Sequence, residues 1–526
     1  MKAKLHRYWA LVLVFIMVSS VCLLFSCRKD GMFIDEIYTY GLSNSSFAPF
    51  LADIKGGDMK DTVFTREELL DYVSVTGDEG FDFSSVYYNQ VNDVHPPLYY
   101  WLFNVVSSLD HGGFSKWTGL ILDYIIYIAA VFMLYKLVCR LGGSRMNGCA
   151  AAVLYGLSVI GLSTMLMIRM YVLLTLLTLV LAWFIACLMD EFRPRTCICI
   201  ALTLLAGLMT QYYFVFYAFF LCAAYVVYAL IKKQYKALAW FIPCALAGAL
   251  SLLIVFPACL DHLFSGKLVS GGSAVDNLKN FAQYPARLRT FIGAAIHGLK
   301  AAIYTAFAAL IALAVLFGKV RTAAKEQHID LRWLVFIIPA FVTFLLVAVI
   351  SPVDEARYIY NLIPIFVLTV SFLLYLLEES AGEFRNRDKV TAAVFLCIAA
   401  LALWEARCAP PEYLYPEYRE YDALAEEHAH EPCVYFTDNY SAPMTQDFLQ
   451  LILFDDVYVT DTRSFDGMLR YIGDADRAVV YIDISEFWSS GYDPDELLRR
   501  IAAETDFDRA EVLYRNGLSE TYVIFK

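Results

Sequence analysis

Two groups of ionisable side chains lie between the first and second apolar segments of the chain. Asp35 and Glu36 are adjacent acids in the run "GMFIDEIYTYGLSNSS", and Asp93 and His95 precede two prolines in "NDVHPPLYYWLFNVV". A carboxylate within hydrogen-bond reach of a hydroxyl can remove its proton as the oxygen attacks. A histidine titrates near neutral pH and can be positively charged beside an anion. These four residues are therefore candidates for acid–base and anion-binding chemistry.

The same residues also have a structural interpretation. Acids in a first turn stabilise a helix, so Asp35 and Glu36 can simply cap a helix that begins "EIYTYGLS". Pro96 and Pro97 suit the start of a helix running "PLYYWLFNVV", whose free backbone donors could hold an anion. Hard divalent cations bind carboxylates, so a cation held by Asp35 and Asp93 is a further candidate, although two ligands do not define a site. The sequence leaves these alternatives open.

The elements that position these residues are mainly apolar. The chain has 526 residues, of which 59% are hydrophobic and 16% aromatic, and its mean hydropathy is +0.55. These values are typical of a membrane protein, in which about 20 apolar residues cross the hydrocarbon core as a helix. We expect an all-α polytopic membrane region with about eleven spans, near residues 8–26, 117–138, 148–166, 170–189, 196–211, 213–231, 237–256, 299–317, 333–350, 358–377 and 389–405.

Lysine and arginine predict the orientation, because short cytoplasmic loops are enriched in both. Basic residues precede the first predicted span and follow every even-numbered one, as in Lys2, Lys4, Arg7, Lys136, Arg140, Arg145, Arg193, Arg195, Lys232, Lys233, Lys236, Lys319, Arg321, Lys325, Arg332, Arg385, Arg387 and Lys389. The large first loop, residues 27–116, and the C-terminal region are then extracytoplasmic, with Arg28 and Lys29 as exceptions. The first span also resembles a secretory signal, and the loop after it lies outside in either case.

The charge and the β-rich runs of the C-terminal region predict a separate domain there. Residues 407–526 contain 25 acidic and 10 basic residues, which argues against a nucleic-acid partner. The β-rich runs "CVYF", "VYVT", "AVVYIDI" and "TYVIF" alternate with helical stretches, and Asp493 before Pro494 predicts a helix start. We therefore expect a transmembrane domain at residues 1–405 and an extracytoplasmic α/β domain at residues 406–526.

The motifs of the first loop resemble those of a known family. Asp35 and Glu36 after the first span, followed on the same loop by "DVHPPLYYWL", resemble the GT-C glycosyltransferase superfamily, especially protein O-mannosyltransferases and their bacterial relatives. The resemblance covers roughly residues 1–405. It implies a polytopic enzyme that uses a sugar carried on a polyprenyl phosphate, works on the outer face and inverts the anomeric configuration.

Two later segments extend the resemblance. "MIRMYVLLTL" places Arg169 and Tyr171 at the start of the fourth span, and "DEARYIYNLIPIF" places Arg357 and Tyr358 at the start of a late span. A leaving phosphate develops negative charge, which preorganised cations stabilise best where water is excluded. Arg357 is the first candidate for this role and Arg169 the second, with snorkelling to the interface as the alternative for each arginine and an ion pair as a further alternative for Arg357.

The other roles and two departures follow from the same resemblance. Asp35 is the candidate base for the acceptor hydroxyl, and Glu36 is expected to orient it or to hold an acceptor group. Asp93 and His95 are expected to contact the donor phosphate, the acceptor or a metal. The family pattern often has a glutamate at the place of Met167 and a histidine at the place of Gln211.

The sequence thus predicts a membrane glycosyltransferase that moves a sugar from a polyprenyl-phosphate carrier to a protein, lipid or cell-envelope polymer outside. A lipid or sugar transporter is a different class to consider, and it would favour repeats and interrupted helices near the midplane. A non-catalytic scaffold for envelope assembly is the third, and the departures at residues 167 and 211 are compatible with it.

Overall fold

A computed structural model describes residues 2–77, 79–110, 113–264, 277–316, 330, 332–381, 387–438, 442–485 and 491–526. The chain divides into two compact units. The first unit, called here the helical unit, comprises residues 1–26, 94–99 and 120–412. The second, called the mixed unit, comprises residues 27–93, 100–119 and 413–526. The first loop thus clusters with the C-terminal region, whereas the sequence analysis grouped it with the transmembrane domain.

The helical unit is built from apolar helices. In the described chain, eight are long and apolar enough to span a membrane: α1 (Lys2–Cys27), α7 (Lys116–Arg140), α10 (Tyr171–Asp190), α12 (Phe214–Ile231), α13 (Tyr235–Leu250) with α14 (Leu252–Val255), α20 (Arg332–Ile350), η2 (Ala356–Leu362) with α21 (Ile363–Ala381), and α22 (Arg387–Cys408). These helices confirm a multi-pass membrane fold. Three further elements account for the remaining predicted spans.

Two of these elements are bent pairs. The α8 helix (Arg145–Gly156) meets α9 (Val159–Leu166) at 61°, and η1 (Phe281–Gln283) with α17 (Tyr284–Gly298) meets α18 (Lys300–Val315) at 84°. If each pair is one span, the described chain has up to ten. The shorter apolar helix α11 (Pro194–Leu208) lies at the fifth predicted span, residues 196–211. The basic residues expected at 319–325 and 385 lie outside the described residues.

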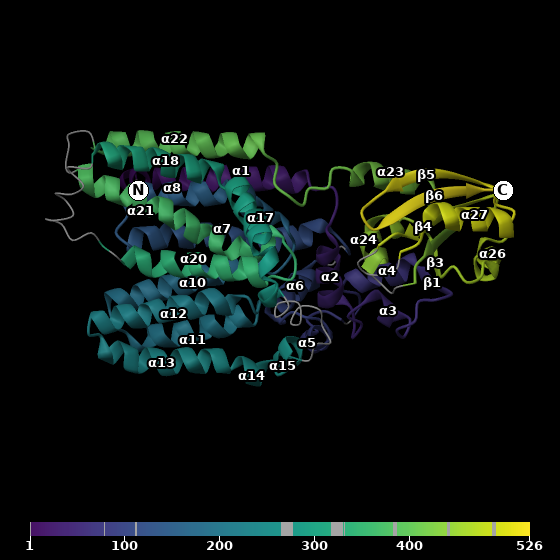
Figure 1. The fold of residues 1–526 in the computed structure, drawn as a ribbon, viewed down its shortest axis with the longest axis horizontal. Helices are drawn as coiled ribbons and strands as arrows, with labels where there is room; N and C mark the ends of the chain where they lie inside the picture. Colours follow the sequence, from purple (N-terminus) through teal and green to yellow (C-terminus); the bar gives the residue numbers. More distant parts are fainter. Residues whose placement is uncertain are drawn as a thin grey trace. The chain divides into compact units, whose positions relative to one another are not determined.

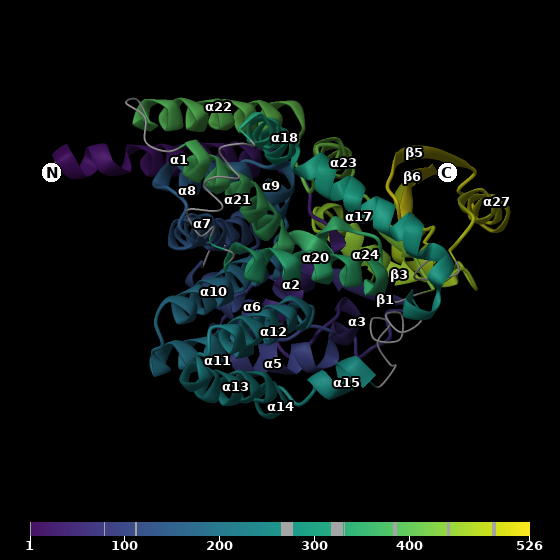
Figure 2. The same cartoon turned by 60° about the vertical axis from the view of Figure 1, so that its left-hand side comes forward.

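The helices of this unit pack in two neighbouring groups. Figure 1 shows α10, α11, α12 and α13 side by side, and α10 and α12 also pack on η2 and α20, respectively. In Figure 2, α22 runs beside α18, and α8 packs against α21 and α22. At the bend after α17, the buried carboxylate of Glu405 accepts backbone N–H bonds from Lys300 (3.0 Å) and Ala301 (2.6 Å). A carboxylate at this helix start satisfies donors that have no partner within the helix.

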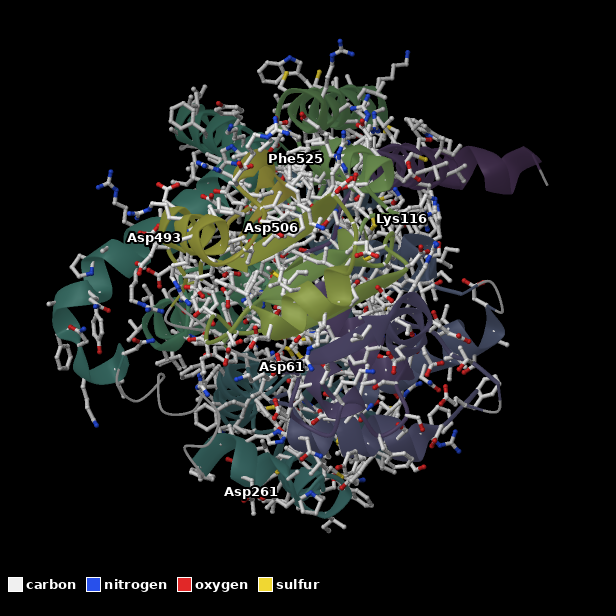
Figure 3. The ribbon with its side chains drawn as sticks, turned by 90° about the vertical axis from the view of Figure 1, so that its right-hand side faces the viewer. Asp61, Lys116, Asp261, Asp493, Asp506 and Phe525 are labelled. Atoms are coloured by element: carbon white, nitrogen blue, oxygen red, sulfur yellow. The ribbon has the colours of Figure 1, made fainter. Side chains whose placement is uncertain are left out.

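The mixed unit contains the first loop. Its helices are α2 (Ile34–Asn44), α3 (Leu51–Ile54), α4 (Arg66–Val73), α5 (Phe83–Asn92) and most of α6 (Leu98–Leu109). The C-terminal part adds α23 (Tyr418–Glu427), α24 (Ala442–Gln446), α25 (Phe448–Leu451), α26 (Asp466–Ile472) and α27 (Pro494–Glu504). Asp493, labelled in Figure 3, caps α27 by accepting the N–H groups of Asp495 (3.0 Å) and Glu496 (3.2 Å), as predicted. The α15 helix (Cys259–Phe264) belongs to the helical unit.

One sheet joins the two parts of the mixed unit. Its strands are β1 (Thr62–Thr65), β2 (Cys433–Phe436), β3 (Asp456–Thr460), β4 (Arg477–Asp483), β5 (Arg509–Arg515) and β6 (Ser519–Phe525), in the order β1-β3-β2-β4-β6-β5. The central β3, β2 and β4 are parallel, and the flanking pairs are antiparallel. All four predicted strands are confirmed. The edge strands β1 and β5 were not predicted, and β1 comes from the first loop.

The sheet register fixes the core of this part. Val434 of β2 lies opposite Tyr458 of β3 and Val480 of β4, and these side chains share a buried apolar cluster with residues of α26 and α27. Successive strand side chains point to opposite faces. On the other face, the buried rings of Tyr435 and Tyr481 stack with centroids 5.5 Å apart. Both faces of the central strands are therefore covered.

The Tyr435 hydroxyl donates 2.7 Å to Asp447, a fully buried carboxylate. Asn516 also donates to this carboxylate. Burial raises the pKa of Asp447 to about 6, although the hydrogen bonds from its neighbours oppose the shift. An aspartate in an unfolded chain has a pKa of about 3.9. The folded chain thus binds this proton more tightly than the unfolded chain does.

We expect the stability of the mixed unit to fall as the pH rises. The contribution of protonated Asp447 is full below about pH 4 and is lost as the pH passes through about 6, a change of up to about 3 kcal/mol. Thermal unfolding of the detergent-solubilised protein between pH 4 and pH 7.5 measures this, and Asp447→Asn should flatten the profile whatever its constant offset. The exposed Asp474→Asn is the control. An unchanged slope in Asp447→Asn would refute the assignment.

Candidate functional site

The start of α2 separates the roles of the two adjacent acids. The Glu36 carboxylate accepts the backbone N–H of Phe33 (2.6 Å) and pairs with the Lys29 ammonium at 2.9 Å. Both charged side chains are 0% exposed. Lys29 also donates to the Tyr413 carbonyl oxygen at 2.7 Å, which attaches the beginning of the first loop to the C-terminal region. Glu36 therefore caps α2 and neutralises a buried lysine, which accounts for one of the two basic residues that the orientation rule did not explain.

Asp35 differs from its neighbour. It is partly exposed, and its backbone carbonyl accepts the Thr39 hydroxyl at 3.0 Å within α2. Successive helical residues are separated by about 100° around the axis, so the inward direction of Glu36 leaves Asp35 facing elsewhere. The helix-cap interpretation thus applies to Glu36. Asp35 is the second residue of the same helix, whose start is held by the buried ion pair between Glu36 and Lys29.

The helix that was predicted after Pro96 and Pro97 is present in the structure. The prolines are followed by α6, whose first residue, Leu98, donates its N–H to the Met209 carbonyl at 2.9 Å. One of the donors expected for an anion is therefore used by the chain itself. Asp93 directly follows α5, is 9% exposed, and donates its N–H to the Asn89 carbonyl at 3.0 Å. His95 is partly buried and belongs to the helical unit, whereas Asp93 belongs to the mixed unit.

The helical unit gathers predicted residues around a cluster of tyrosines. Tyr171 begins α10, and its ring meets those of Tyr358 and Tyr360 edge to face, at centroid distances of 6.5 and 6.1 Å. Tyr213 lies 5.3 Å from Tyr358. Arg169, two residues before Tyr171 and only 3% exposed, lies in the short turn between α9 and α10. The broken span α8–α9 and the 3-10 turn η2 thus bring the two predicted Arg-Tyr segments together.

Arg357 has an ion-pair partner within this unit. Its Nε lies 2.9 Å from Glu355, and its guanidinium lies 5.6 Å from the centroid of the Tyr358 ring. The predicted surface ion pair is therefore present, although the Arg357 side chain is only 11% exposed. The other neighbouring acid, Asp354, pairs at 3.0 Å with Arg287, a buried arginine that the sequence analysis did not select. Arg287 also donates to Ser351 Oγ at 2.8 Å.

Glu412 is a second residue that the sequence did not reveal. The Tyr360 hydroxyl donates to its carboxylate at 3.1 Å, and its N–H donates to Ser163 Oγ at 2.9 Å. Ser163 lies on α9, one turn before Met167. A carboxylate from a distant part of the chain thus lies near the segment where the family pattern often has a glutamate. No local spacing connects Glu412 with this segment, so only the fold could reveal it.

Two other polar pairs occupy the helical unit. The Tyr212 hydroxyl lies 2.9 Å from Nδ1 of His262, a buried histidine on α15. His262 thus contacts the residue that follows Gln211, the position where the family pattern often has a histidine. Asp123, fully buried in α7, accepts the Tyr99 hydroxyl at 2.8 Å. Within the part of the chain that the structure describes, no group of three or more His, Cys, Asp or Glu side chains is placed to hold a metal ion.

The fold and these residues define a multi-pass membrane protein with a buried Arg-Tyr cluster in one unit and an accessible acid on a fixed helix in the other. The family model described as dolichyl-phosphate-mannose-protein mannosyltransferase matches residues 94–260. No curated protein matches the chain in sequence.

Solved structures match over most of the chain. ArnT from Cupriavidus metallidurans bound to undecaprenyl phosphate has 12% identity, a TM-score of 0.52, and coverage of 98% of both chains. The oligosaccharyltransferase AglB from Archaeoglobus fulgidus has 9% identity and a TM-score of 0.46, over 94% of this chain and 72% of that one. The mycobacterial arabinofuranosyltransferase AftD has 15% identity and a TM-score of 0.44, over 99% and 40%. The family match and the ArnT likeness confirm the predicted resemblance: the chain has the fold of the GT-C superfamily of membrane glycosyltransferases.

The buried ion pair between Lys29 and Glu36 should contribute to the stability of the mixed unit. Glu36→Gln should leave the Lys29 ammonium buried without its counter-charge and destabilise the unit by about 3–5 kcal/mol. Lys29→Met combined with Glu36→Gln should recover most of this loss. Thermal unfolding and the yield of monodisperse protein measure both variants. Equal losses in Glu36→Gln and in the double variant would contradict the ion-pair assignment.

Proposed function

We propose that this protein transfers a sugar from a polyprenyl-phosphate carrier to an acceptor on the extracytoplasmic side of the membrane. The observation that carries the proposal is the pair of acids on α2, where the Glu36 side chain is fully buried and Asp35 is partly exposed. A general base needs an accessible carboxylate on a support that does not move. The similar fold of ArnT, whose structure contains undecaprenyl phosphate, supports a polyprenyl-phosphate donor.

In the proposed reaction, the acceptor hydroxyl oxygen attacks the anomeric carbon of the donor sugar. The bond between that carbon and the phosphate oxygen breaks, the hydroxyl proton moves to the Asp35 carboxylate, and the polyprenyl phosphate leaves with the electron pair. A single displacement inverts the anomeric configuration. Glu36 acts as a positioning residue because it caps the helix that carries Asp35.

The arginines of the helical unit are proposed to bind the phosphate. Arg357 is almost buried, and its guanidinium is held by Glu355 and by the Tyr358 ring. Arg169 is buried beside Tyr171. A cation already fixed in a site that excludes water stabilises a developing negative charge without reorganisation. Asp93 and His95 remain proposed contacts to donor or acceptor, and a divalent cation remains a candidate cofactor.

We also propose the orientation that the basic residues predict. The first loop and residues 406–526 then lie outside the cytoplasm, and the acceptor is a protein, a lipid or an envelope polymer. Cysteine accessibility to a membrane-impermeant reagent tests this orientation directly.

Asp35→Asn should abolish sugar transfer. Loss of a general base lowers rates by about 100- to 10,000-fold. The measurement is transfer from a panel of radiolabelled polyprenyl-phosphate sugars in membranes that contain equal amounts of inserted protein. Asp495→Asn is a matched control, because Asp495 occupies the same second position in α27. Full transfer by Asp35→Asn would refute Asp35 as the base, and no transfer from any donor by the wild type would refute the enzyme.

Arg357→Ala should reduce transfer about 100- to 1,000-fold through loss of phosphate stabilisation. Glu355→Gln removes the counter-charge but keeps the arginine, so it should retain most of the activity. Single-turnover rates and thermal stability of both variants separate the two roles of Arg357. If both variants lose stability and activity to the same extent, Arg357 serves only as an ion-pair partner.

A lipid or sugar transporter is the second candidate. The two bent helix pairs favour it, because interrupted spans line the substrate sites of many transporters. Purified protein in liposomes distinguishes the classes: a transporter moves the labelled polyprenyl-phosphate sugar or free sugar across the bilayer without forming a new glycosidic bond, whereas the proposed enzyme forms one.

A further inference from the structure

A large groove lies within the mixed unit, separate from the residues considered so far. Its cavity volume is about 1230 Å³, above the range of about 300–1,000 Å³ that is usual for drug-sized ligands. It is called the loop groove here. Its walls come from the start and end of α4, residues 75–77, 80 and 81, the end of α6 with Phe114, and Asp455 before β3. A volume of this size suits a segment of a polymer rather than a single small molecule.

The charged side chains that line the loop groove are mostly acidic. Its described residues include the exposed carboxylates of Glu67, Asp71, Asp110 and Asp455, one guanidinium, from Arg66, and the hydroxyls of Thr65, Ser74, Thr76, Ser107 and Ser108. Two of these carboxylates accept hydrogen bonds from threonine hydroxyls. Thr76 donates to Asp71 at 2.5 Å, and Thr118 donates to Asp110 at 2.7 Å. An excess of fixed carboxylates repels phosphate-bearing and carboxylate-bearing ligands and attracts neutral polyols or amines.

An aromatic ring stands among these polar groups. Phe81 is 48% exposed, and its φ of 59° lies in the left-handed region that bulky residues avoid. Its N–H donates to Ser108 Oγ at 2.8 Å, and Ser108 in turn donates to the Asn104 carbonyl at 2.6 Å. The chain thus maintains a strained backbone position that presents an apolar ring at the groove. Carboxylates and hydroxyls beside an exposed ring suit sugars, which have both polar hydroxyls and apolar C–H faces.

The loop groove is attached to the helix that carries Asp35. Asn104 of α6 donates to the Ser43 carbonyl at 2.9 Å, and Asn44 donates to the Val73 carbonyl at 2.8 Å, at the end of α4. Both groove walls are therefore bonded to the last turn of α2, while Asp35 lies in the first turn. Asp35 and Ser43 are eight residues apart along α2, which corresponds to about 12 Å of helix. A ligand in the groove thus lies beyond the reach of a single sugar residue from Asp35.

We infer that the loop groove binds the acceptor, and that the acceptor is an extended neutral or amino-bearing glycan. The inference rests on the proposed function, because it names the substrate class for that reaction. The glycan is held several residues away from the hydroxyl that reacts. A peptide acceptor is the competing class, but peptide recognition along a sheet edge uses pockets for alternate side chains, and the described lining contains few aliphatic residues.

The test is direct binding of defined trisaccharides to the full chain in detergent, without any donor. The probes are mannotriose and chitotriose as neutral ligands, the glucosamine trisaccharide as a cationic one, and trigalacturonate as an anionic one. Saturation-transfer NMR and calorimetry should detect the neutral and cationic probes and not the anionic one. Asp71→Lys should weaken the cationic probe more than the neutral ones.

Phe81→Ala should weaken binding of the neutral probes about tenfold, and the chain offers a close control. Phe47 is also exposed (50%), also has a positive φ (53°), and also donates its N–H to a serine hydroxyl at 2.8 Å, but it packs on Tyr88 and does not line the groove. Phe47→Ala should bind as the wild type does. Binding of none of the trisaccharides, equal losses in both phenylalanine variants, or displacement of the probes by a serine-rich peptide would overturn the inference.

These outcomes are independent of the proposed function. Trisaccharide binding requires neither the donor nor a transfer step, so a chain that transfers no sugar still gives a decisive binding result. Conversely, sugar transfer to an acceptor that does not compete with the trisaccharides would retain the enzyme and remove the groove from its acceptor site.

Discussion

The ion pair between Lys29 and Glu36 is the interaction on which the mixed unit depends. It is fully buried, so its geometry must satisfy both charges, because removal from water costs several kcal/mol per ion. Glu36 meets this requirement with the Phe33 N–H, and Lys29 meets it with the Tyr413 carbonyl. One pair of charges therefore caps α2, fixes the direction of Asp35 and joins residues nearly four hundred positions apart in sequence. Glu36, which the sequence motif suggests as a catalytic residue, caps the helix that carries its neighbour Asp35.

The helical unit holds arginines within an apolar environment. These arginines lie at breaks between helices. The turn between α9 and α10 places Arg169 before a helix start, and η2 places Arg357 before α21. The Arg357 guanidinium lies 5.6 Å from the centroid of the Tyr358 ring, and a cation over a ring gains electrostatic attraction at a low cost of desolvation. Glu355 and Glu412 supply carboxylates to the same cluster through Arg357 and Tyr360. Irregular backbone in membrane helices is tolerated where protein groups satisfy it.

Local signals in the sequence predicted much of the fold. Hydropathy located the apolar segments, and the helix start at Asp493 followed from a cap and a proline. Non-local pairing escaped prediction. β1 has only four residues, and its place in the sheet depends on β3, nearly four hundred residues later. β5 is an edge strand with charged, exposed residues, so its alternation is weak. Among the candidate site residues, the family resemblance selected Asp35, Arg169 and Arg357, which stay predictions, whereas Glu412 and His262 reach their clusters only through tertiary packing.

Charge is divided between the two units in a way that fits the proposed chemistry. The C-terminal residues carry a large excess of acids, and the loop groove adds carboxylates from the first loop. The arginines that we assign to the phosphate belong to the helical unit. If phosphate-binding and acceptor-binding groups had the same sign, the donor head group would compete for the acceptor groove. In the proposed arrangement, an acidic groove would prevent this competition, because repulsion raises the free energy of a bound phosphate there while it leaves a neutral glycan unaffected. Specificity for the acceptor can therefore come from excluding the donor as much as from recognising the sugar.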